Sequence, residues 1–176
     1  MNLDQLISLI RQNKRHNYIY HFTDNSNFPW IHQYGLLSKD SATLLAVPVP
    51  RPGGDAQSRI SDSIRGISND VSMCLTMNHP MAFRCRQDGR HPSQYYLGVD
   101  PEVLRTPGVR VALGLANAHT TEIIPIDEAI ERIDIDVLYR WVEPPEFLPR
   151  IRAAERIEVL VPSGIPKELI KKKFKP

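Results

Sequence analysis

Three places along this 176-residue chain combine side chains that could do chemistry. The first is residues 18–27, where His21 stands late in an expected strand and Thr23 and Asn27 follow in a polar turn. Loops at strand ends commonly present functional side chains. An isolated histidine more often has a structural role, so it is the grouping of His21, Thr23 and Asn27 that indicates a binding site.

The second place holds three arginines, Arg51, Arg59 and Arg65, spaced among Gly, Ser and Asp residues. A guanidinium offers paired N–H donors whose geometry matches phosphate oxygens, so this series suits a pyrophosphate. The competing interpretation is that each arginine is a solvated surface charge.

The third place is Glu158, in the apolar, strand-like residues 157–161. A carboxylate that faces a protein core is costly, so Glu158 either points to solvent or enters a cleft as a functional group. Glu155 offers a second carboxylate three residues earlier. Because an odd spacing along one strand puts the two on opposite faces, only one of them can enter the same cleft.

Other kinds of chemistry lack their motifs. The sequence contains no glycine-rich phosphate loop and no HExxH, CxxC or GxSxG pattern. Cys74 and Cys85 do not have metal-ligand spacing, so we expect no metal site and two plain thiols in a reducing cytoplasm. No apolar run approaches the roughly 20 residues that a membrane span needs, so we expect no membrane partner.

The charge is unevenly distributed. Residues 122–158 carry ten acidic and five basic side chains, whereas the rest of the chain has a net charge of +7. The basic residues concentrate in 51–65, 84–110 and 171–175. Such a distribution can attract a polyanion, although the same charges also suit an ordinary solvated surface.

The elements that must position these groups are short. Apolar periodicity and Gly/Pro punctuation predict helices over 3–13, 29–34, 57–64, 126–141, 147–154 and 166–173, and strands over 18–22, 71–76, 95–99, 109–113 and 155–162. Residues 46–55, with three prolines and two glycines, form a loop. Short strands and helices without a regular βαβ rhythm predict an α+β fold, and we expect one domain over 1–176.

Four segments in order resemble a known family. They are YHFTDNSNFPWIHQYGLL (20–37), NDVSMCLTMNHPM (69–81), IDIDVLYRW (133–141) and ERIEVLVPSGIPKELI (155–170). Together they resemble the DarT family, the single-stranded-DNA thymidine ADP-ribosyltransferases of bacterial toxin–antitoxin pairs. The resemblance implies an ADP-ribosyltransferase-like fold, a split mixed β-sheet core with short flanking helices, and NAD⁺ as substrate.

The resemblance also assigns roles. His21, Thr23 and Asn27 would line the nicotinamide and its ribose, and Glu158 would be the catalytic glutamate. The family carries its catalytic arginine between the first two segments, where Arg59 has the best spacing and Arg65 follows it. Arg51 would bind NAD⁺ and is the remaining candidate for the catalytic role.

The chemistry then follows from the bond that breaks. Cleavage of the nicotinamide–ribose bond leaves a cation-like ribose, which a carboxylate such as Glu158 stabilises, while an arginine holds the pyrophosphate. An acceptor base must be unstacked, which favours a single strand, DNA before RNA, lying in a basic groove. The groove candidates are His91, Tyr95, Tyr96, Arg84, Arg86 and Arg90, with loop 115–122 (His119, Thr120) beside them.

Two alternatives stay open. One is an ADP-ribosyltransferase or NAD glycohydrolase acting on RNA, protein or water, and Ser72 in the central strand keeps a protein acceptor in view. The other is a non-catalytic nucleic-acid-binding module, which requires only the basic residues and leaves Glu158 and His21 unexplained. If the toxin interpretation holds, a macrodomain antitoxin that removes ADP-ribose is the expected partner.

Overall fold

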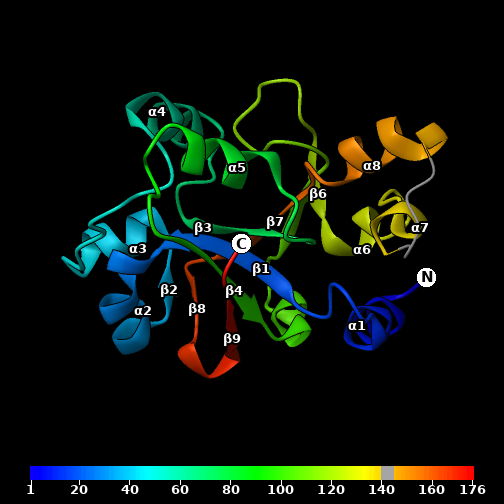
Figure 1. Cartoon of the computed structure of the whole chain (residues 1–176), viewed down its shortest axis with the longest axis horizontal. Coiled ribbons are helices and arrows are strands. Elements are labelled where there is room, and N and C mark those ends of the chain that lie inside the picture. The colour runs from blue at the N-terminus through cyan, green and yellow to red at the C-terminus, as the bar shows by residue number, and fades with distance from the viewer. Residues whose placement is uncertain (140–144) are drawn as a thin grey trace.

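A seven-stranded sheet forms the centre of the molecule (Figure 1). The computed structural model describes residues 1–139 and 145–176. The strand order is β6-β5-β7-β3-β1-β4-β9, and every pairing among the described strands is antiparallel. Their bounds are β1 Ile19–Asp24, β3 Asp70–Cys74, β4 Gln94–Val99, β5 Arg110–Ala112, β6 Ile123–Pro125, β7 Glu158–Pro162 and β9 Ile170–Phe174. Strands β2 (Leu36–Leu37) and β8 (Gly164–Ile165) pair separately.

The sheet is split between its two central strands. β1 pairs with β4 over six residues and β3 pairs with β7 over five. In contrast, the register between β1 and β3 is the single pair Tyr20↔Cys74. The backbones diverge beyond that pair, so residues 21–24 and 70–73 face each other across an opening. The expected split is therefore present, although the sheet is antiparallel rather than mixed throughout the described residues.

In residues 1–139 and 145–176, eight short α-helices flank the sheet (Figure 1). Their bounds are α1 Leu3–Gln12, α2 Phe28–Tyr34, α3 Lys39–Leu44, α4 Ala56–Ile64, α5 Pro80–Gln87, α6 Ile126–Ala129, α7 Ile135–Leu138 and α8 Leu148–Ala154. α1 starts with a capping box between Asn2 and Gln5 and buries its apolar stripe in the core. α5 covers one face of the sheet through Ala82, which packs with Tyr20, Cys74 and Tyr96.

The predicted helix over 126–141 is wrong in its described part. It is two one-turn helices, α6 and α7, because Asp134 has a non-helical ψ of 75° and interrupts the run. Ile130 and Ile133, which lie in the break, both pack into the core. Arg140 and Trp141, the end of the predicted helix, lie outside the described residues.

The predicted closing helix over 166–173 is also wrong. A 3₁₀ turn at Lys167–Leu169 leads into the edge strand β9, which pairs with β4. Ile170 and Phe174 are partly buried while the three lysines between them are exposed, a charged edge that discourages further strand pairing. The backbone hydrogen bonds that β4 offers outweigh the local helical preference of residues 166–173. The sequence of this segment does not show that β4 lies beside it.

The strand expected over 155–162 begins three residues later than predicted. β7 starts at Glu158, whereas Glu155 is the C-cap of α8. Glu155 and Glu158 therefore do not share a strand, and the argument from opposite faces does not apply to them. Within the described residues, no helix is long and apolar enough to cross a membrane.

Candidate active site

A cavity of about 730 Å³ opens where the sheet splits. Its floor is formed by the diverging strands, with His21, Phe22 and Thr23 from β1 on one side and Ser72 and Glu158 from β3 and β7 on the other. α3, the loop 46–55 and α4 form the rim. The volume falls within the range typical of small-molecule sites.

Glu158 lies at the edge of this cavity on a firmly held backbone. It pairs with Cys74 of β3 and with Ala112 of β5, and its side chain is 13% exposed. The Ala116 amide donates a hydrogen bond to Oε1 at 3.2 Å. Burial raises the pKa of the Glu158 carboxyl to about 7, against the opposing effects of the Ala116 amide, the Ser72 hydroxyl and the Lys39 ammonium. At neutral pH both protonation states of this carboxyl are populated.

His21 of β1 bridges the split in the sheet. Its Nδ1 lies 3.0 Å from the carbonyl oxygen of Ser72, so a side chain makes the link that the diverging strands no longer make. Because a carbonyl can only accept, Nδ1 carries the proton. Burial lowers the pKa of His21 to about 4, so the ring is neutral at pH 7 and Nε2 is left as an acceptor.

Asn27 fixes the loop that forms the rim. It is buried, and its Nδ2 donates to Thr23 Oγ1 at 3.0 Å and to the carbonyl of Arg51 at 2.8 Å. Its Oδ1 accepts from the backbone N–H of Arg51 at 3.0 Å. The Asn27 side chain therefore holds both the N–H and the carbonyl of Arg51. This contact gives Asn27 a role in supporting the loop as well as the expected role in contacting the ligand.

The three candidate arginines are in different places. Arg51 and Arg59 line the cavity, and neither forms an ion pair with a described residue. Arg65 lies outside the cavity lining and donates to the carbonyls of Ala116, His119 and Thr121. Arg65 thereby orders loop 115–122, whose Ala116 amide contacts Glu158, and acts on the site through that loop.

Two residues that the sequence did not single out also lie at the cavity. Lys39 of α3 forms an ion pair with Asp62, a buried residue of α4. The positive charge of Lys39 also acts to lower the pKa of Glu158. His79 is 2% exposed, caps α5 through Nδ1, and places Nε2 3.7 Å from Glu158 Oε1. The only advance signal for His79 was its position before Pro80, which marks a helix start.

Histidines surround Phe22 in the floor of the cavity. His21 and His79 stack against its ring at centroid distances of 6.2 and 6.1 Å, and His91 approaches at 6.0 Å. Burial lowers the pKa of all three, so they are neutral near pH 7. Both ring nitrogens of His91 lack a hydrogen-bond partner among the described residues. These nitrogens are fully buried, and the Arg51 backbone raises the pKa of the ring against the larger effect of burial.

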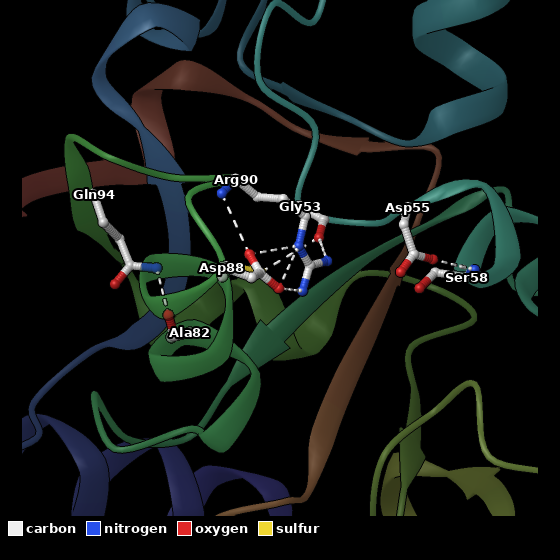
Figure 2. Close-up of polar contacts among 8 residues, drawn as sticks. Gly53, Asp55, Ser58, Ala82, Asp88, Arg90 and Gln94 are labelled. Atoms are coloured by element: carbon white, nitrogen blue, oxygen red, sulfur yellow. Dashed lines mark hydrogen bonds and ion pairs between the residues drawn. The ribbon is translucent and has the colours of Figure 1, made fainter.

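A second set of contacts holds the rim near residue 53 (Figure 2). The Arg90 guanidinium pairs with Asp88 and donates to the carbonyl of Gly53. Asp55 caps α4 by accepting from the Ser58 amide at 2.8 Å. The loop 46–55 is therefore held at residue 51 by Asn27 and at residue 53 by Arg90.

The other groove candidates are dispersed. Tyr96 is buried, and Tyr95 packs against Phe28 with the Lys173 ammonium 3.9 Å from its ring centroid, so neither offers a free stacking platform. Arg90 serves in the brace, and His91 lies inside the cavity. Arg84 and Arg86 are exposed. His119 and Thr120 are exposed on the loop that Arg65 orders. The described residues contain no cluster of acidic, His and Cys side chains that could hold a metal ion.

Both the sequence and the fold of this chain are similar to those of known proteins. Residues 20–173 match the family described as "ssDNA thymidine ADP-ribosyltransferase, DarT". A comparison with curated protein sequences gave no match. Among solved structures, the chain is similar to Thermosipho africanus DarTG in complex with ADP-ribose, with a TM-score of 0.69 and 18% identity over 89% of this chain and 43% of that chain.

Thermus sp. 2.9 DarT is similar in two complexes. The complex with ADP-ribosylated ssDNA gives a TM-score of 0.65 at 17% identity, and the complex with NAD⁺ gives 0.58 at 16%. Each match covers 88% of this chain and 79% of the Thermus chain. At such identities the likeness shows the fold, and it confirms the expected α+β, ADP-ribosyltransferase-like architecture. The chain spans less than half of the Thermosipho chain.

Proposed function

Since this chain belongs to the DarT family of single-stranded-DNA thymidine ADP-ribosyltransferases, we propose that it transfers ADP-ribose from NAD⁺ to a base in single-stranded DNA. The observation that supports this most directly is the position of Glu158. It is a mostly buried carboxylate that lines, together with His21, a cavity large enough for a dinucleotide's reactive half. By analogy with the family, thymine is the acceptor base.

In this proposal His21 and Thr23 receive the nicotinamide end of NAD⁺. The neutral His21 ring presents Nε2 as an acceptor, and His91 lines the same cavity. Arg51 and Arg59 hold the pyrophosphate at the rim, where their guanidinium groups are not engaged by carboxylates of the described residues. Arg65 is a positioning residue, because its donors are occupied by the carbonyls of loop 115–122.

Glu158 performs two tasks in the transfer. As a carboxylate it stabilises the positive charge that develops on the ribose when the C–N bond breaks and nicotinamide leaves with the bonding electrons. The acceptor nitrogen of the base then bonds to the ribose carbon and loses its proton. Glu158 can accept that proton, because its raised pKa of about 7 makes it a stronger base than an exposed glutamate.

The biological setting completes the proposal. NAD⁺ and single-stranded DNA meet in the cytoplasm, so we place the enzyme there. The modification of DNA would be toxic, and a macrodomain antitoxin that removes ADP-ribose is the partner that this chemistry calls for. The toxin–antitoxin context of the family supports both the toxic effect and the macrodomain partner.

The test is transfer of label from NAD⁺ to three separate acceptors, single-stranded DNA, RNA and bulk protein. Purified protein is compared with Glu158→Gln, and Glu155→Gln serves as the matched control because Glu155 caps α8 outside the strand. We expect label on DNA that is lost in Glu158→Gln and kept in Glu155→Gln. Label on RNA or protein alone would replace the acceptor, and unchanged activity of Glu158→Gln would refute the role of this carboxylate.

A further inference from the structure

The arginines of the molecule differ in whether a carboxylate neutralises them. In the acidic C-terminal half, Arg132 pairs with Glu122 and Arg150 pairs with Asp134. Arg110 pairs with Asp70 in the same way. Arg84 and Arg86 of α5 are exposed and form no ion pair within 4 Å among residues 1–139 and 145–176. Two cationic groups close together on one helix are therefore available to an external anion.

An exposed aromatic ring lies beside these arginines. Phe83 is 54% exposed on α5, and the Arg86 guanidinium carbon lies 5.7 Å from the centre of its ring. α5 buries Ala82 and Cys85 instead, so Phe83 lies on the face turned away from the sheet. An aromatic face bordered by guanidinium groups is the combination on which a nucleic-acid base stacks while its phosphates pair with arginine.

This face adjoins the cavity. α5 starts immediately after His79, which approaches Glu158, and Met81 and Cys85 line the cavity from the same helix. The charge of Arg84 helps to lower the pKa of Asp55, the last residue of the loop that forms the rim. The Gln94 amide donates to the carbonyl of Ala82 at 2.8 Å and fixes α5 to β4 (Figure 2). α5 is thus a rigid wall with the cavity on one side and the Phe83 face on the other.

We propose that Phe83, Arg84 and Arg86 bind the nucleotides next to the modified base in single-stranded DNA. Phe83 stacks on a neighbouring base, and the two arginines pair with the phosphates that lead from the cavity over α5. The proposal rests on the proposed function and names the surface that holds the DNA outside the catalytic cavity. The proposal also predicts that affinity for DNA increases with strand length, because a single nucleotide bound in the cavity does not reach α5.

The test measures affinity for ligands of increasing length, from a single thymidine nucleotide to a twelve-nucleotide strand around one thymidine, with Phe83→Ala and the double variant Arg84→Gln/Arg86→Gln. For the longer strands we expect Phe83→Ala to weaken binding by about 5- to 150-fold, the range for loss of one base–aromatic stack. The double variant should lower the slope of log affinity against log salt by about 1.4, at about 0.7 per phosphate contact. A single thymidine nucleotide, which has no neighbouring base, should bind all proteins alike.

Arg150→Gln is the matched control, because Arg150 also lies over an aromatic ring, Phe147 at 5.3 Å, but is paired with Asp134. NAD⁺ hydrolysis without DNA reports that each variant is folded and that its cavity is intact. Unchanged affinity of both α5 variants for long strands would overturn the inference while leaving the proposed function standing. A wild-type protein that hydrolyses NAD⁺ but binds no DNA of any length would overturn both.

Discussion

At the scale of single residues, the protonation of Glu158 links activity to stability. Its carboxyl has a pKa of about 7 in the folded protein, above the value of an exposed glutamate, because burial penalises the charged form. The folded state therefore holds this proton over a pH range in which the unfolded chain has lost it. Stability from this group is complete at acid pH and declines as the pH rises toward 7.

We predict that Glu158→Gln stabilises the protein at alkaline pH while it abolishes transfer. Above pH 8 the variant should gain about 1–3 kcal/mol in the free energy of unfolding over wild type, and the gain should vanish below about pH 4.5. Denaturant titrations at several pH values measure this difference. In parallel, wild-type transfer should rise with pH through about 7, as the carboxylate forms. A variant less stable than wild type at pH 8 would show that burial of the charged Glu158 carboxylate does not destabilise the folded protein.

The site's residues were predictable from sequence to different degrees. His21, Thr23, Asn27, Arg51 and Glu158 all meet at the cavity, and each was marked by a local signal such as a strand end or a carboxylate among apolar residues. His79 and Lys39 carried no such signal, because their proximity to Glu158 arises from helices that fold back over the sheet. Local patterns show what a residue can do, but tertiary packing decides which residues meet.

At the scale of elements, the loop 46–55 depends on contacts made by neighbours distant in sequence. Its prolines and glycines predicted a loop correctly, but its conformation is set by Asn27 at residue 51 and by Arg90 at residue 53. The same limit explains the error at β9. Residues 166–173 have a helix-like pattern, and only the exposed hydrogen-bonding edge of β4 turns them into a strand.

We predict that Asn27→Ala loosens this loop and weakens NAD⁺ binding more than it slows the chemical step. The substitution leaves the part-buried N–H and carbonyl of Arg51 without the Asn27 side chain, which costs about 1 kcal/mol for each hydrogen bond lost. The KM for NAD⁺ should rise by about tenfold or more with a smaller change in kcat. Asn27→Asp is the graded control, since it can accept from the Arg51 N–H but cannot donate to the carbonyl. Equal kinetics for the two variants would argue against the loop as the cause.

At the scale of the whole molecule, the fold is two half-sheets that meet at a single pair. Tyr20 and Cys74 form the single registered pair between β1 and β3, and the His21 side chain adds one more link, to Ser72. The ligand cavity occupies the gap between the halves, so a bound dinucleotide would contact residues of both. Anything that binds only the folded state stabilises it, by about 2.7 kcal/mol at a ligand concentration of 100 Kd.

We therefore predict that NAD⁺ protects both sides of the split at once. In Glu158→Gln, which should bind NAD⁺ without consuming it, amide hydrogen exchange should slow in residues 21–24 of β1 and in residues 70–73 of β3, and Tm should rise by roughly 5–10 °C near 100 Kd. Nicotinamide alone, which cannot span the gap, should protect the β1 side and raise Tm less. Protection by NAD⁺ confined to one half-sheet would mean that the ligand does not bridge the split, and the catalytic geometry drawn from Glu158 and His21 would have to be abandoned.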